Sequence, residues 1–177
     1  ASVEETTIED YEWLMGINWW GVLYGTKFFL PHLQKVDEAH IVNISSVFGL
    51  MGVPTQSAYN AAKFAVRGFT ECLRQELVDT HIGVSCVHPG GIKTNIAASA
   101  RFKTSPTGEK LDHSVAADKF AQIARTTPEE AAATIVRGIE KKSPRVLIGA
   151  DAVAIDLMVR ALPESYATVL GAALKLS

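Results

Sequence analysis

The chain has 177 residues, of which 47% are hydrophobic, and its mean hydropathy is +0.13. This length and composition predict a globular protein with a substantial core and exclude a disordered chain. A net charge of −2 gives no reason to expect nucleic acid or an anionic membrane as partner. Cys72 and Cys86 are too few and too isolated for a disulfide framework or a zinc site. No run of about eighteen apolar residues and no signal-peptide pattern occurs, so we expect a soluble, cytoplasmic protein.

The first predicted element is a helix. Thr7 is a cap residue and acidic residues follow it, which is typical of a helix start. Apolar residues then recur as far as Leu33, and Pro31 is expected to kink or end the helix. The β-branched run Ile41–Ile44 predicts a short, buried parallel strand.

The middle of the chain predicts a second helix and a second strand. The helix extends from about Ser57 to Leu77, and the strand covers residues 83–88 and stops at Pro89 and two glycines. Residues 95–126 carry scattered charge, with weak helical signals from Ser114 to Arg125, and are expected to form a loop region.

The last part begins with a strong helix start at Thr127, where a cap residue, a proline and a glutamate follow one another in the expected order. This helix is predicted to reach about Lys142. A strand at 145–148 and helices at 151–162 and 166–176 follow, the last two separated by Pro163. Strands that alternate with helices predict an α/β fold with a parallel sheet and helices on both faces.

Three residues carry a possible chemistry. Tyr59 and Lys63 lie four residues apart and therefore on one face of a helix, and Ser46 precedes Tyr59 by thirteen residues. A phenol ionises near pH ~10, and a neighbouring cation favours the phenolate, so Lys63 is expected to lower the pKa of Tyr59. A serine hydroxyl at the end of a strand could hold a carbonyl or alcohol oxygen. These groups could move a proton on and off that oxygen.

Four motifs resemble the short-chain dehydrogenase/reductase family, in its order and spacing. They are the serine strand Val42–Ser46 followed by Gly49, the Tyr-x-x-x-Lys helix, the Pro-Gly loop from Pro89 to Thr94 and the Asn-x-x-Gly segment from Asn18 to Gly21. The resemblance is detailed from Ile8 to Thr94 and looser to about Ala152. It implies a Rossmann-like, doubly wound sheet and one domain over 1–177, with a substrate loop at 95–126.

The resemblance also implies roles. Tyr59 is the general acid/base, Lys63 lowers its pKa and holds the nicotinamide ribose, and Ser46 binds the reacting oxygen. Asn18 opens its helix and holds a water that relays protons. In the Pro-Gly loop, the residues expected to contact the cofactor are Pro89, Gly90, Ile92 and Thr94. The substrate would be a small alcohol or ketone, and the cofactor NAD or NADP.

Other features of the family are absent from the sequence. Its Gly-x-x-x-Gly-x-Gly turn does not occur, and Gly21 to Gly25 is expected to serve helix packing instead. We therefore expect this chain to be the C-terminal portion of a family member, cut or partly recorded, with roughly a hundred preceding residues. Family members commonly form dimers or tetramers through the helices that carry Asn18 and Tyr59, and the same is expected here.

Alternatives remain at this point. Tyr59 and Lys63 could be a surface pair, Ser46 could cap a turn, Asn18 could serve packing and Thr94 could be a helix cap. The whole chain could be a non-catalytic remnant that keeps its pairing helices. A serine hydrolase built on Ser46 would need a Gly-x-Ser-x-Gly elbow, which does not occur. No metal-ligand spacing links the five histidines, which are expected to be structural or exposed: His32, His40, His81, His88 and His113.

Overall fold

The computed structural model describes residues 1–96, 100 and 120–176. Its first element is one long helical segment made of α1 (Ile8–Met15), a π-helical turn (Gly16–Trp20) and α2 (Gly21–Leu33). The Thr7 hydroxyl accepts a hydrogen bond from the Asp10 amide at 3.2 Å, as its sequence position predicts. Pro31 lies inside α2, but the helix ends only two residues later.

Three parallel strands form the sheet, in the order β1-β2-β3. They are β1 (Ala39–Ile44), β2 (Ile82–Pro89) and β3 (Arg145–Ile148). Ile44 pairs with Val87, and Pro89 pairs with Ile148, so the carboxyl ends of all three strands lie at the same edge. Ligands of open α/β sheets bind just beyond the carboxyl ends of the strands.

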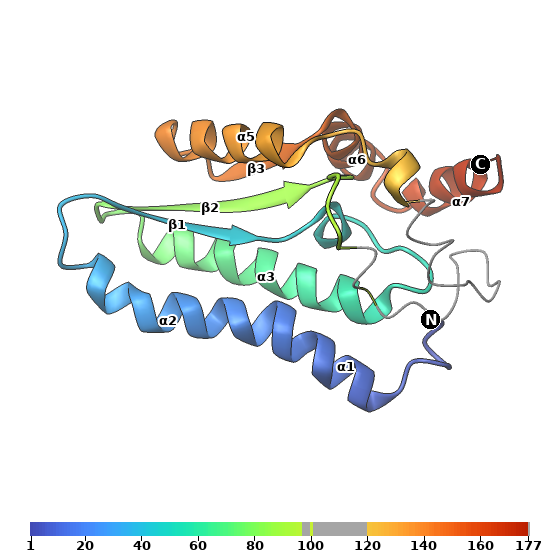
Figure 1. The fold of residues 1–177 in the computed structure, drawn as a ribbon, viewed down its shortest axis with the longest axis horizontal. Helices are drawn as coiled ribbons and strands as arrows, with labels where there is room; N and C mark the ends of the chain where they lie inside the picture. Colours follow the sequence, from blue (N-terminus) through green and yellow to red (C-terminus); the bar gives the residue numbers. More distant parts are fainter. Residues whose placement is uncertain (97–99, 101–119, 177) are drawn as a thin grey trace.

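Helices cover both faces of the sheet (Figure 1). On one face lies α3 (Ser57–Glu76), with α1 and α2 beyond it; on the other lie α5 (Pro128–Glu140) and α6 (Ala150–Ala161). The capping box predicted at Thr127 and Glu130 is present at the start of α5. The final helix is α7 (Tyr166–Leu176). These features confirm the predicted α/β fold with a parallel sheet and flanking helices.

The core has a centre on each face of the sheet. Ile41, Leu73, Leu77, Ile82 and Val84 form one cluster between the sheet and α3. On the α5 face a second cluster is formed by four residues, namely Val87, Ala131, Val146 and Ile148. Ala62 and Val66 in α3 are fully buried, so this helix is fixed tightly against the strands that end at the candidate site.

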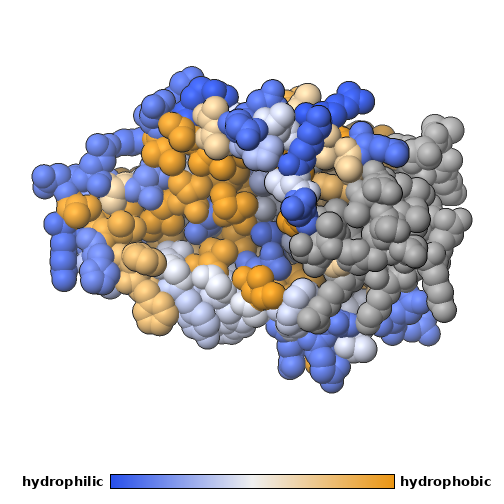
Figure 2. All heavy atoms as spheres, in the orientation of Figure 1, coloured by the Kyte–Doolittle hydropathy of each residue, from blue (hydrophilic) through white to orange (hydrophobic). Residues whose placement is uncertain are grey.

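Strand β1 lies at one side of the described sheet and is partly exposed at its end. Among the described strands β1 pairs only with β2, and Ile44 at its end is 41% exposed. Figure 2 shows apolar side chains gathered between the levels of α2 and α5, where β1 lies.

Both cysteines are free, as predicted, with Cys72 exposed and Cys86 buried. No described helix is long and apolar enough to cross a membrane.

Candidate active site

The candidate site is built where the strands end. Ser46 follows β1 by two residues and has an extended backbone, with φ −168° and ψ 169°. Its hydroxyl accepts a hydrogen bond from the Phe48 amide at 3.1 Å, so it caps the short 3₁₀ turn Val47–Gly49. The capping role considered from the sequence is therefore real, and it coexists with an interaction between Ser46 and the Tyr59 side chain that acts to lower the pKa of Tyr59.

Tyr59 and Lys63 project from the first turns of α3 toward that strand end. The Lys63 ammonium lies 5.5 Å from the centre of the Tyr59 ring, and the ring of Phe48 meets Tyr59 edge-on at 5.8 Å. Lys63 is 8% exposed and donates a hydrogen bond to the Ile44 carbonyl at 3.1 Å. Ser46, Tyr59 and Lys63 therefore lie together, and the reading of Tyr59 and Lys63 as a solvated surface pair is wrong.

The electrostatics of this group differ from the sequence expectation. Burial raises the pKa of Tyr59 above its ordinary value, and the interaction with Ser46 only partly opposes this effect. Burial also lowers the pKa of Lys63, against a smaller opposing effect of Cys86. Removing both groups from water favours their neutral forms and is the larger influence on each, so the expectation that Lys63 lowers the pKa of Tyr59 stays a prediction.

Asn18 lies in the π-helical turn that separates α1 from α2. Its side-chain amide donates to the Leu14 carbonyl at 3.3 Å. A π-turn widens a helix locally and frequently occurs at functional sites. The helix is therefore locally widened at Asn18, the residue that the resemblance expected to open it.

The Pro-Gly loop leaves the end of β2 on the same edge. The Gly90 amide donates to the Ile148 carbonyl at 2.9 Å, and Ile92 forms an isolated parallel bridge with Thr126. The Thr94 hydroxyl accepts from the Ile96 amide at 3.4 Å within a local turn, and the helix-cap role considered for it stays an alternative. Much of the expected substrate loop at 95–126, including His113, lies outside the described residues.

Sequence reasoning missed a buried asparagine that shapes the site. Asn60 donates to the carbonyls of Phe48 at 2.7 Å and Met51 at 2.6 Å, and accepts from the Val53 amide at 3.1 Å. It thereby holds the loop that follows Ser46. The signal available was a polar residue on the buried face of a helix, adjacent to Tyr59.

His88 is a second residue that the sequence did not connect with the site. It is fully buried, and its Nδ1 donates to the Ser46 backbone carbonyl at 3.0 Å, while its Nε2 has no partner among the described residues. Burial lowers the pKa of His88, and the hydrogen bond to Ser46 opposes this in part. Because the imidazole contacts the carbonyl and not the hydroxyl of Ser46, the geometry does not favour a serine hydrolase.

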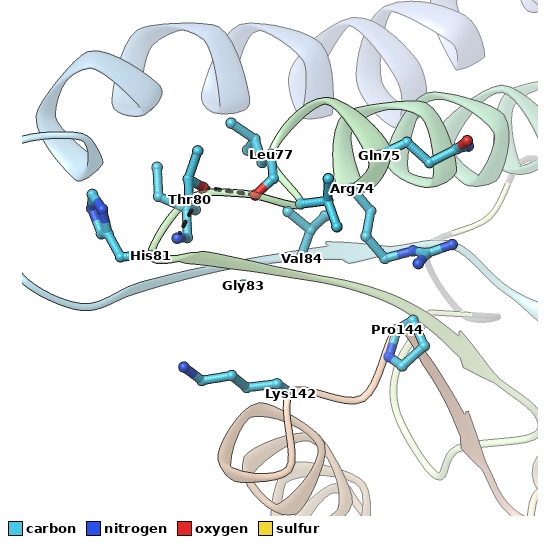
Figure 3. Close-up of a pocket in the computed structure, with 11 residues that line it drawn as sticks. Arg74, Gln75, Leu77, Thr80, His81, Gly83, Val84, Lys142 and Pro144 are labelled. Atoms are coloured by element: carbon cyan, nitrogen blue, oxygen red, sulfur yellow. Dashed lines mark hydrogen bonds between the residues drawn. The ribbon is translucent and has the colours of Figure 1, made fainter.

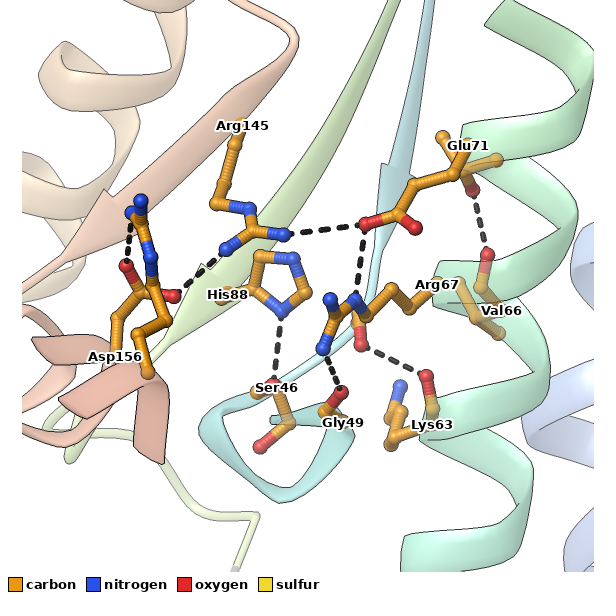
Figure 4. Close-up of polar contacts among 12 residues, drawn as sticks. Ser46, Gly49, Lys63, Val66, Arg67, Glu71, His88, Arg145 and Asp156 are labelled. Carbon is orange, nitrogen blue, oxygen red and sulfur yellow. Dashed lines mark hydrogen bonds and ion pairs between the residues drawn. The ribbon is translucent and has the colours of Figure 1, made fainter. Parts of the chain in front are cut away.

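Ion pairs join the elements behind the site (Figure 4). Glu71 contacts Arg67 at 2.9 Å and Arg145 at 3.2 Å, and Arg145 contacts Asp156 at 2.7 Å. This series of pairs links α3, β3 and α6. Its role is structural, because it ties the helix that carries Tyr59 to the opposite edge of the sheet.

A groove of about 560 Å³ lies at the other, amino-terminal end of β2 (Figure 3). Arg74, His81 and Lys142 are among its lining residues. It is distant in the fold from the strand ends that carry Ser46 and the Pro-Gly loop, so we do not assign it to the site. Within residues 1–96, 100 and 120–176, no cluster of side chains suited to a metal ion occurs.

Comparisons with known proteins indicate the family of the chain. The family model for short chain dehydrogenase matches residues 1–104. SadH of Mycobacterium tuberculosis is 49% identical over 175 residues, which are 97% of this chain and 62% of that protein. Dehydrogenase/reductase SDR family member 7B of Xenopus tropicalis is 34% identical over 148 residues, covering 84% of this chain and 46% of its own. The chain therefore spans about half to two thirds of these relatives' lengths.

Solved structures show the same fold. A short chain dehydrogenase/reductase from Burkholderia phymatum, in complex with NAD, superposes with a TM-score of 0.74 at 28% identity, covering 90% of this chain and 60% of that one. A short chain dehydrogenase from Burkholderia cenocepacia, in complex with NADP, gives a TM-score of 0.75 at 22% identity over 95% of this chain and 62% of that one. With the family model matching more than half of the sequence, the chain belongs to the short-chain dehydrogenase family.

Proposed function

We propose that the complete protein is a nicotinamide-dependent oxidoreductase that interconverts an alcohol and a ketone or aldehyde. The observation that carries this proposal is the grouping of Ser46, Tyr59 and Lys63 at the carboxyl ends of the strands. The family membership and the NAD held by the Burkholderia phymatum relative support the cofactor class. NAD and NADP both remain candidates.

The residues present fit such a cofactor. An ammonium has three N–H donors, and among the described contacts the Ile44 carbonyl is the acceptor for Lys63, which leaves donors for a ribose hydroxyl. Pro89 and Gly90 bring backbone close to the same edge, where the main chain of Ile92 and the side chain of Thr94 would hold a carboxamide. When bound, the cofactor supplies or accepts the hydride at the substrate carbon.

The chain's own residues handle the proton. In reduction, the Tyr59 hydroxyl gives its proton to the carbonyl oxygen, and the Ser46 hydroxyl holds that oxygen in place. In oxidation, the tyrosine oxygen takes the alcohol proton back. Since burial raises the pKa of Tyr59, its protonated, donating form predominates at neutral pH in the ligand-free chain. Asn18, in its π-turn, is proposed to support proton exchange with solvent.

Pairing of subunits through α1, α2 and α3 also stays a proposal. Trp20, Tyr24 and Phe28 follow one another at helical spacing, with ring centres 5.5 Å and 6.1 Å apart. All three are exposed, and Phe28 is 72% exposed. An apolar row of this kind is typical of a surface that another copy of the chain covers.

The test of the proposed function is Tyr59→Phe in the complete natural polypeptide that contains these residues. We expect dinucleotide-dependent turnover to fall about 10²- to 10⁴-fold, because the proton donor is lost while the ring remains. The far-ultraviolet circular dichroism should be unchanged. Tyr11→Phe is the matched control, because the Tyr11 hydroxyl contacts Ser57 of the same helix at 2.6 Å but lies outside the proposed chemistry. Turnover of Tyr59→Phe close to that of the control would refute the assignment.

A further inference from the structure

Three hydrogen bonds hold Gly90 and Gly91 in the turn after β2. Two connect backbone groups: Gly90 donates to Ile148 at 2.9 Å, and Gly91 accepts from Thr126 at 3.3 Å. The third depends on a side chain, because the Gly91 amide donates to the Asp151 carboxylate at 2.7 Å. Sixty residues separate these two partners in the sequence.

Two glycines make room for this carboxylate. A Cβ atom on Gly90 would collide with the carboxylate of Asp151, and so would a Cβ atom on Gly149. Gly149 also has a φ of 95°, a conformation that residues with side chains rarely adopt. Because glycines from two separate segments leave space for the same charged group, the contact is a specific feature of this fold and not an accidental surface approach.

The position of Asp151 in its helix adds to the contact. It lies in the first turn of α6, where the backbone N–H groups favour a negative charge. Its carboxylate is thus held at the helix end while it accepts the hydrogen bond from Gly91. A charge-assisted hydrogen bond of this kind is stronger than one between neutral groups.

We infer that Asp151 is a positioning residue for the cofactor-binding loop. By fixing the Gly91 amide, it sets the direction in which the chain leaves β2 and so the placement of Ile92 and Thr94. This inference rests on the proposed function, which assigns those two residues to the nicotinamide. Holding a binding loop in its bound conformation raises affinity, since less ordering is needed when the ligand arrives.

A purely structural role makes a different prediction. If Asp151 only stabilised the start of α6, its loss would lower stability and leave cofactor affinity unchanged. Asp156 is a matched control on the same helix, because it is 5% exposed and pairs with Arg145 at 2.7 Å, away from the turn. Asp156→Asn should therefore lower stability without a selective effect on the cofactor.

The experiment uses the complete natural polypeptide with Asp151→Ala, Asp151→Asn or Asp156→Asn. The dissociation constants for NADH and NADPH are measured by fluorescence titration, and exchange of the Gly91 amide is followed by NMR. We expect Asp151→Ala to weaken dinucleotide binding about fivefold, as loss of one typical hydrogen bond does, because this contact is exposed. Asp151→Asn should recover most of this affinity, because its amide oxygen can accept the same bond. Asp156→Asn should bind within about twofold of wild type.

Three results would overturn the inference: unchanged affinity in Asp151→Ala, an equal loss of affinity in Asp156→Asn, or unchanged exchange of the Gly91 amide in Asp151→Ala. Wild-type protein that binds neither dinucleotide would refute the proposed function. In that case the Gly91 amide still tests the contact. Faster exchange in Asp151→Ala would support Asp151 as the group that holds the turn, and unchanged exchange would contradict it.

Discussion

Replacing Asn60 by alanine should lower the free energy of unfolding, because it removes the hydrogen bonds of the Asn60 side chain. The side chain is 8% exposed and makes three hydrogen bonds to backbone groups of the loop after Ser46. The bond to the Met51 carbonyl is buried, and those to Phe48 and Val53 are partly buried. Alanine would leave all three backbone groups without this partner.

The expected loss follows from these contacts. A typical intramolecular hydrogen bond contributes about 1 kcal/mol, so the three together give a decrease of about 3 kcal/mol in the free energy of unfolding. Urea denaturation followed by circular dichroism measures it, with the loss read from the midpoint at constant slope. Turnover of the complete protein should also fall, because the same bonds hold the loop that carries Ser46.

Gln75→Ala provides the matched control. It removes an amide side chain from the same helix, but its bond to the Glu71 carbonyl at 3.1 Å is exposed. Its effect should stay within about 0.5 kcal/mol. A decrease below about 1 kcal/mol for Asn60→Ala, or one no larger than that of the control, would show that water replaces these bonds and that the reasoning fails.

Two further predictions concern His88 and Gly49. Burial lowers the pKa of His88, so its contribution to stability is present above the unfolded pKa of about 6.5 and is lost as pH falls through the folded pKa. His88→Gln should therefore make the slope of unfolding free energy against pH, between pH 7 and 5, shallower by up to about 1.4 kcal/mol per pH unit. An unchanged slope in urea denaturation at a series of pH values would contradict this. Gly49→Ala would place a Cβ atom 2.8 Å from the Lys63 carbonyl and should cost about 1–3 kcal/mol and reduce turnover. Gly68→Ala, with no atom within 4 Å, is its control, and equal effects of the two would refute the packing argument.

Local sequence patterns predicted the secondary structure well because their signals are local. The cap at Thr7, the capping box at Thr127 and the β-branched strand before Ser46 each depend on a few adjacent residues. One departure is Pro31, which lies within α2 two residues before its end. A proline in the last turn removes a single hydrogen bond, and packing of the helix outweighs this cost.

The burial of the site could not be predicted in the same way. Spacing placed Tyr59 and Lys63 on one helical face, but it did not indicate that both would be withdrawn from water. Mutual attraction alone predicts a lower pKa for the tyrosine, whereas burial acts in the opposite direction and is the larger effect. The contacts of Asn60, His88 and Asp151 were equally inaccessible, because each partner is fixed by the fold and not by the local sequence.

The site is held together more by its surroundings than by contacts among the proposed catalytic groups. Lys63 bonds to the Ile44 carbonyl, and the Ser45 hydroxyl returns a bond to the Lys63 carbonyl at 2.9 Å, so the strand end and α3 are joined twice. His88 joins the neighbouring strand to the backbone of Ser46. Each of these bonds ends on a backbone carbonyl, which moves only if the strand or helix moves. The distances among Ser46, Tyr59 and Lys63 are therefore set by the scaffold, as the proposed proton transfer would require.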